Sequence, residues 1–334
     1  MTKTPDTTES WMLIEIFGHT QDPTVIAVGQ TEKPFAPLDK IVKSRTHRAA
    51  IRAVLHTIVS DDQPHVIDFV QHTTRYIFVP LTDFAGYTSA VLVHYADEQA
   101  DVPTPPACGA WYFNVSNATA HDSTELLDMY RVPEDQRRTG RALHGAFQRL
   151  VGQDHEAIQK LIEKRPGVTH QAYETVDTDD GYRWIAHYSC RFVAHGDQIV
   201  LHGVTRQVGP YRDGTPAPDP FGLTAQLTQH RPIPGFYQMI LDPKTGAILR
   251  TYDGIPVRVP QDAKDLTDLL ADREAVADAL AALQHVASTG QQVDDFPVTN
   301  INGRETRVRL EPILVGDATA VLASFRTRSI ISPR

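Results

Sequence analysis

The sequence of 334 residues is poor in cysteine and contains no long apolar run. Its two cysteines, Cys108 and Cys190, lie far apart without metal-type spacing, so no disulfide framework is predicted. Residues 1–10 are polar and lead into no apolar signal core, and no stretch approaches the roughly 18 apolar residues that a membrane span needs. We therefore expect a cytoplasmic protein in a reducing compartment, with no membrane partner.

Basic charge is scarce as well. Lysine and arginine number 32 against 41 aspartates and glutamates, giving a net charge of −9, so we expect no nucleic acid partner. Apolar residues make up 41% and charged residues 22% of the chain, the ordinary balance of a globular protein. At about 150 residues per domain, the length predicts two or three domains.

The sequence motifs of common enzymes are missing. There is no Gly-x-Ser-x-Gly elbow, no phosphate-binding loop and no kinase signature. Paired acids at 61–62, 179–180 and 294–295 fall at turns or strand edges, where solvated turn residues are the simplest interpretation. The 15 histidines form no close metal-type spacing. We predict no enzyme and no metal site; the alternative is an enzyme whose catalytic groups meet only in the folded chain.

One order of elements recurs three times along the chain. Each third reads strand, turn, strand, short helices, a longer helix and three strands, with a period of roughly 100–120 residues, the size of a domain. Prolines and acidic residues gather in two stretches that we interpret as linkers. This order predicts a flexible tail at 1–10, domains at 11–97, 108–208 and 222–330, and linkers at 98–107 and 209–221.

Hydrophobic periodicity predicts the individual elements. A longer helix is expected in each third, at 46–59, 154–164 and 273–288, and the middle one is expected to lie across the strands that follow it. The proline-bearing segment 33–38 is predicted to be a loop, and 143–150 a second short helix. Strands are predicted at 11–17, 24–28, 66–69, 76–81, 88–95, 109–115, 169–176, 182–192, 198–206, 235–241, 247–252, 293–298, 304–310 and 319–326.

Five short motifs in the middle third give it a family resemblance. They are Gly109-Ala-Trp111, Ser123–Tyr130, Leu150–Asp154, Gly181–Trp184 and Leu201–Gly203. With these motifs the middle third resembles a PAS domain, and the outer thirds are similar to PAS domains by element order alone. A GAF domain is the alternative for the first third. The resemblance implies an α+β fold of three tandem PAS-like domains, each a five-stranded antiparallel sheet with short helices forming a pocket over one face.

Some PAS domains bind haem through a helix histidine or flavin beside a cysteine. Nothing in the sequence marks His144, His155 or His285 as a haem ligand. Cys190 falls on a strand rather than in the helical region that carries the flavin-linked cysteine, so a small buried apolar residue is the better interpretation. We therefore predict no cofactor.

The middle domain also supplies the candidates for a ligand pocket. Residues 182–192 alternate, with Trp184 and Tyr188 on one face and His187 mostly on the other. Aromatic and apolar side chains around the sheet fill a core or line a small-molecule pocket, and both readings remain open. The candidates are Trp111, Met129, Tyr130, Phe147, Tyr173 and Trp184, with His187 and His202 as polar contacts.

Several strands, including 76–81, 89–93 and 318–325, are apolar on both faces. A sheet with helices on one side should be polar on the other, so we expect a neighbouring domain, a flanking helix or a second chain to cover the outer faces. The resemblance implies a homodimer or protein partner there. The predicted function is a non-enzymatic sensory or regulatory protein that acts through a separate output protein. A ligand-free interaction scaffold is the alternative, and an enzyme the second alternative.

Overall fold

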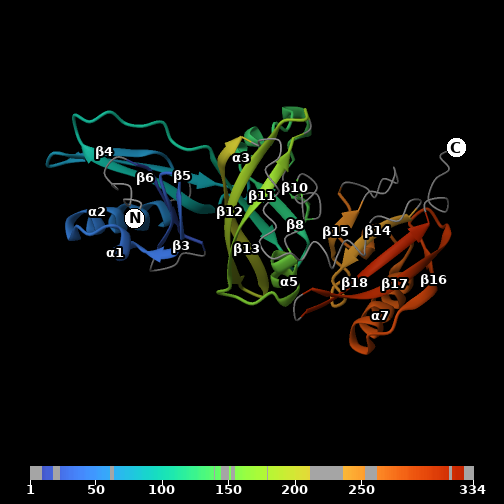
Figure 1. The fold of residues 1–334 in the computed structure, drawn as a ribbon. Coiled ribbons are helices and arrows are strands. Elements are labelled where there is room, and N and C mark those ends of the chain that lie inside the picture. The colour runs from blue at the N-terminus through green and yellow to red at the C-terminus, as the bar shows by residue number, and fades with distance from the viewer. Residues whose placement is uncertain are drawn as a thin grey trace. The chain divides into compact units, whose positions relative to one another are not determined.

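The computed structural model forms three mostly antiparallel sheets that follow one another along the chain (Figure 1). Sheet predominates and helices are few, so the coarse expectation of a three-sheet fold with α and β elements is confirmed. The residues described are 10–17, 23–60, 64–138, 140–143, 150–151, 155–178, 180–210, 236–252, 262–315 and 318–326.

The first sheet has six strands in the order β3-β2-β1-β6-β5-β4. Helix α2 covers one face because Ile51, Leu55 and Ile58 recur at helical spacing and are all buried. Its elements are β1 (Met12–Glu15), β2 (Thr24–Val28), β3 (Thr31–Pro37), α1 (Leu38–Ile41), α2 (Arg45–Ser60), β4 (Ile67–Gln71), β5 (Thr74–Thr82) and β6 (Thr88–Asp97).

The second sheet has seven strands in the order β10-β11-β12-β13-β7-β8-β9. Ser123 caps helix α3, because its hydroxyl accepts a hydrogen bond from the Leu126 amide at 3.2 Å. The elements are β7 (Cys108–Asn114), β8 (Thr119–Asp122), α3 (Thr124–Met129), η1 (Glu134–Gln136), β9 (Arg141–Ala142), β10 (Leu150–Val151), α5 (His155–Glu163), β11 (Thr169–Asp177), β12 (Arg183–His195) and β13 (Gln198–Pro210).

The third sheet has five strands in the order β15-β14-β18-β17-β16. Asp272 caps helix α7 by accepting a hydrogen bond from the Ala275 amide at 2.9 Å. Exposed and buried residues alternate along 305–310, within the strand predicted at 304–310. The elements are β14 (Phe236–Leu241), β15 (Ile248–Tyr252), η3 (Leu266–Asp268), α7 (Arg273–Thr289), β16 (Val293–Thr299), β17 (Glu305–Val315) and β18 (Ala318–Arg326).

Contacts divide the chain into two compact units. The first comprises residues 1–112, 121–139 and 166–213, and the second comprises residues 113–120, 140–165 and 214–334. The first sheet belongs to the first unit, together with β11, β12, β13 and most of β7. The third sheet and α5 belong to the second unit.

In the first unit, the six-stranded sheet buries both of its faces. Met12 and its neighbours pack under α1 and α2 on one side. On the other side, Leu13 and Leu92 pack with Ala110 of β7 and Val204 of β13. The prediction that the two-sided apolar strands of this sheet are covered is confirmed, and the cover comes from within the chain.

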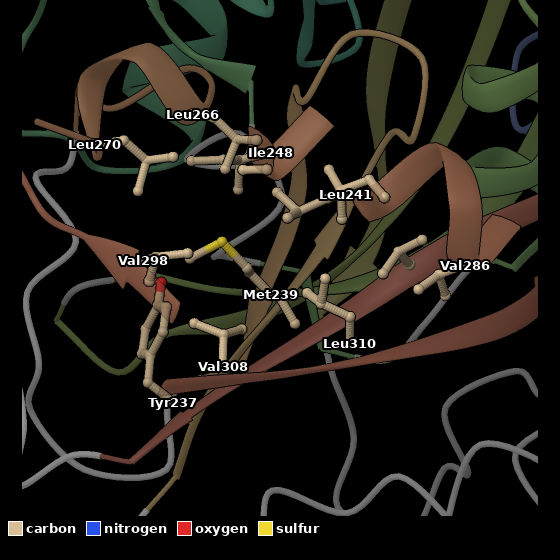
Figure 2. Packing of buried hydrophobic residues seen from close by; sticks show 14 of the residues in the cluster. Tyr237, Met239, Leu241, Ile248, Leu266, Leu270, Val286, Val298, Val308 and Leu310 are labelled. Carbon is tan, nitrogen blue, oxygen red and sulfur yellow. The ribbon is translucent and has the colours of Figure 1, made fainter. Parts of the chain in front are cut away.

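In the second unit, the five-stranded sheet also has a core on each face. Figure 2 shows Met239, Val308 and Leu310 pointing toward one another within the core that packs under η3 and α7. On the opposite face α5 packs against β17 and β18, and Ile162 joins Leu322 in a second apolar cluster. The expectation that 154–164 lies across the strands that follow it is therefore wrong. Helical periodicity identifies an apolar stripe but not the sheet that it covers.

Two further expectations need correction. Residues 33–38 were expected as a loop, but they fall largely in β3, whose Pro34 is tolerated because β3 is an edge strand. The expected five strands per sheet are found in the third sheet only. Strand β3 adds a sixth strand to the first sheet, and the second sheet has seven strands, of which β9 and β10 are only two residues long. Residues 144–149 of the predicted short helix and most of the linker at 209–221 lie outside the described residues, and Leu150 falls in β10.

Candidate functional site

Aromatic side chains gather on one face of the second sheet, which we call the inner face. Alternation along β12 places Trp184 and Tyr188 on this face. The ring of Tyr130, just after α3, lies 5.9 Å from that of Trp184. The ring of Trp111, on β7, lies 6.4 Å from that of Tyr188. Elements distant in sequence thus place three of the predicted candidates, Trp111, Tyr130 and Trp184, on one buried surface.

Two glycines allow this close packing. A Cβ atom at Gly203 of β13 would lie 2.1 Å from Cζ2 of Trp111, so the indole ring rests directly on the strand backbone. A Cβ atom at Gly109 of β7 would lie 2.5 Å from the backbone nitrogen of Leu126 in α3. Any larger residue at either position would push the indole or the helix away from the sheet.

The inner face also carries buried polar groups. The Trp111 indole donates a hydrogen bond to the Thr205 hydroxyl at 3.0 Å. The Trp184 side chain is almost wholly buried, and none of the described residues accepts a hydrogen bond from its Nε1. Strand β11 adds the buried residues His170 and Glu174. They alternate in step with Val176, which pairs with Trp184, so they lie on the inner face as well. Apolar walls with a few polar groups are the composition of small-molecule sites.

The eight candidates predicted from the sequence do not form one set. Met129 is half-buried on α3, and Phe147 lies outside the described residues. Tyr173, His187 and His202 lie on the opposite face, which in the first unit is turned toward the first sheet. Tyr173 is 39% exposed, which does not suit a closed pocket.

The opposite face is joined to the first sheet by ion pairs. Arg206 is 1% exposed and donates hydrogen bonds to the Gly29 carbonyl at 2.6 Å and to Glu32 at 2.5 Å. Arg191 pairs at 2.7 Å with Glu15, whose carboxylate is fully buried. Burial raises the pKa of Glu15, and the charge of Arg191 opposes that rise. Buried pairs of this kind fix the position of one sheet on the other, because breaking one leaves an uncompensated charge.

The histidine and tyrosine beside these pairs have strongly shifted pKa values. Burial lowers the pKa of His187 to about 4, although the charge of Glu32 partly opposes this. Burial, together with a hydrogen bond and the negative charge of Glu32, raises the pKa of Tyr173 to about 12. Both groups are therefore neutral near pH 7. Sequence reasoning missed Arg206 and Glu32, because pairing across two domains leaves no local pattern.

Reactive groups are few within the described ranges. No cluster of three or more His, Cys, Asp or Glu residues there has the geometry to hold a metal ion. Cys108 and Cys190 are buried and form no disulfide, and burial raises the pKa of the Cys108 thiol to about 12. No helix in the described part of the chain is long and apolar enough to span a bilayer.

Comparison with known proteins supports the fold. Residues 10–104 match the family model for the N-terminal domain of Rv3651-like proteins. The structure is similar to the crystal structure of an uncharacterised protein from Mycobacterium tuberculosis, with a TM-score of 0.70 and 15% sequence identity over 96% of this chain and 93% of that one. The two chains therefore share a fold over nearly their whole lengths. No curated protein matches the sequence.

Two other solved structures give weaker likenesses. An RNA-binding light-oxygen-voltage receptor has a TM-score of 0.25 and 10% identity, over 66% of this chain and 96% of its own. The periplasmic sensory domain of the Campylobacter jejuni chemoreceptor Tlp1 has a TM-score of 0.24 and 11% identity, over 69% of this chain and 75% of its own. Likenesses of this size carry no argument about fold or function.

Proposed function

We propose that the protein is a non-enzymatic sensor or regulator built from three PAS-like domains, and that its second domain binds a small molecule on the inner face of the second sheet. The order of elements in each third and the PAS-type motifs of the middle third support the PAS-like assignment. The inner-face aromatic residues support the ligand. The signal passes to a separate output protein.

The unpartnered indole of Trp184 carries this proposal. Leaving a buried donor without an acceptor costs about 1–3 kcal/mol, so folded proteins rarely retain one without a reason. The centroid of the Trp184 ring lies 5.9 Å from that of the Tyr130 ring, on a face that also holds Trp111. A ligand with a hydrogen-bond acceptor would satisfy the indole while its flat apolar part packs on the aromatic rings.

These features define the ligand class. The aromatic rings favour a flat, largely apolar molecule. The indole N–H of Trp184 needs a hydrogen-bond acceptor on that molecule, such as a carbonyl oxygen or a ring nitrogen. The partnered hydroxyl of Thr205 and the buried side chains of His170 and Glu174 add polar contacts at the edge of the aromatic set. No group on the inner face is assigned a catalytic role.

The chain offers a matched pair of variants for the test, because it has only three tryptophans. Trp184→Phe keeps an aromatic ring and removes the N–H donor. Trp11→Phe makes the same change in the first sheet, where the indole donates instead to the Pro103 carbonyl at 2.7 Å. Each protein is purified, denatured, and its released small molecules are compared by liquid chromatography and mass spectrometry.

We expect one compound to be released by the wild type and by Trp11→Phe, and to be at least tenfold depleted from Trp184→Phe. The acceptor interaction is worth about 1.5 kcal/mol, which corresponds to this factor. If the two variants release equal amounts of the compound, Trp184 does not contact the ligand. No enriched compound in any sample would count against the ligand altogether.

A further inference from the structure

A groove runs along one edge of the first sheet, between helix α2 and strand β4. Its volume is about 570 Å³. The helix contributes small residues at helical spacing, and the strand contributes the ring of Phe69. The lining residues are Arg45, Thr46, Ala49, Ala50, Ala53, Val54, Phe69 and Gln71.

Strand β4 is the terminal strand of its sheet, and in the described structure its outer edge pairs with nothing. Every second residue of such a strand directs its backbone N–H and C=O away from the sheet. Two apolar side chains beside this edge are exposed, Val66 at 56% and Val70 at 50%. An exposed apolar edge of this kind is a template for another strand.

The small side chains of α2 leave room for that strand. Ala49 and Ala53 are exposed and face the groove, so an added backbone beside β4 can approach the helix closely. Side chains at alternate positions of the added strand would then contact Phe69 and Val54, which supply an apolar floor. This combination of edge pairing and side-chain contact is how extended peptides are bound by strand addition.

The charge beside the groove defines the partner. Helix α2 carries three arginines and no acidic residue. Arg45 lines the groove, and Arg52 is exposed two turns further along the same helix. Neither arginine has an ion-pair partner in the part of the chain that the structure describes. The acid of β4, Asp68, is already neutralised by Arg75 at 2.6 Å. The described ionisable side chains beside the groove therefore leave a surplus of positive charge, which attracts negative charge.

We propose that this groove binds an extended, acidic and β-branched segment of another protein, which adds as a seventh strand beside β4. The assignment is independent of the ligand proposed for the second sheet. It supplies a contact through which the regulator proposed above acts on a partner protein.

The probe is a fluorescein-labelled ten-residue peptide of alternating valine and glutamate, tested against the full chain by fluorescence anisotropy. We expect saturable binding that weakens as salt is raised, because the charges are exposed. A peptide of alternating valine and lysine should bind at least tenfold more weakly. Hydrogen exchange should slow in residues 66–71 when the acidic peptide is added.

Arg45→Glu is the test variant and Arg273→Glu its matched control. Both residues are exposed arginines in helical first turns, and Arg273 lies in the second unit. Reversing the charge of Arg45 should weaken binding by on the order of fivefold, and reversing Arg273 should leave it unchanged. Circular dichroism and melting curves check that both variants fold.

Three results would overturn the assignment. The first is no binding of the acidic peptide, and the second is equal binding of the basic one. The third is a dimer of this chain that Val70→Lys dissociates, since a second copy would then occupy the edge. None of these results bears on the small molecule proposed for the second sheet, because its test measures released compounds and not peptide binding.

Discussion

Replacing Gly203 by alanine should destabilise the first unit, because its new methyl group has no room. A Cβ atom at Gly203 lies 2.1 Å from Cζ2 and 2.2 Å from Cε2 of Trp111, well inside van der Waals contact. Trp111 is 6% exposed, and its indole bonds to Thr205 at 3.0 Å. The ring therefore moves only by disturbing its neighbours and giving up that hydrogen bond.

The size of the effect follows from these two losses. Forcing a methyl group into a packed core costs about 1–3 kcal/mol, and the lost hydrogen bond adds about 1 kcal/mol. For a unit of this size, each kcal/mol lowers the melting midpoint by about 2–4 °C. We expect Gly203→Ala to lower the midpoint of the first unit by roughly 5–10 °C and to shift the tryptophan emission to the red.

Gly209→Ala is the matched control, because it lies on the same strand and nothing lies within 4 Å of its Cβ position. This change should be neutral or stabilising by about 0.4–1 kcal/mol, since it restricts the unfolded chain. Melting is followed by circular dichroism, with emission spectra taken beside it. If both variants melt together and emit like the wild type, Trp111 does not rest on Gly203 and the inner face is packed differently.

Two further predictions concern buried charges. Lys164→Met should destabilise the second unit by about 3 kcal/mol in urea unfolding, because it leaves the fully buried Asp242 without the ammonium 2.7 Å away. The neighbouring Arg165 is 72% exposed in its own ion pair, so Arg165→Met should change the free energy of unfolding by no more than about 0.5 kcal/mol. Equal losses of stability in the two variants would argue against the buried pair. Burial raises the pKa of Asp83 to about 7 from 3.8, so its contribution to stability is complete below pH 3.8 and is lost as the pH rises through 7. Asp83→Asn should flatten that part of the stability profile measured from pH 4 to 8, and an unchanged slope would refute the shift.

Local patterns in the sequence predict much of this fold. Ser123 and Asp272 precede α3 and α7, and both side chains accept a hydrogen bond from a backbone amide in the first turn of their helix. Alternation along 182–192 predicts β12, in which Trp184 and His187 lie on opposite faces and are both buried. Strand β3 is missed because an edge strand needs no complete ladder and so accommodates Pro34.

Local sequence patterns do not show which distant segments pack against each other. The apolar stripe of α5 is visible, but its position on the third sheet depends on strands more than 140 residues further along the chain. The same limit applies to the candidate site. Alternation separates Trp184 from His187 but does not say that the His187 face meets Glu32 and Arg206. Three candidates, Tyr173, His187 and His202, therefore lie on the face that meets the first sheet and not on the inner face.

Native mass spectrometry of the freshly purified full chain tests the central claim most directly. We expect a mass above that of the bare chain that falls to the bare mass on denaturation. The added mass should be present in Trp11→Phe and lost in Trp184→Phe. A bare mass for all three proteins under the gentlest conditions would contradict a ligand on the inner face.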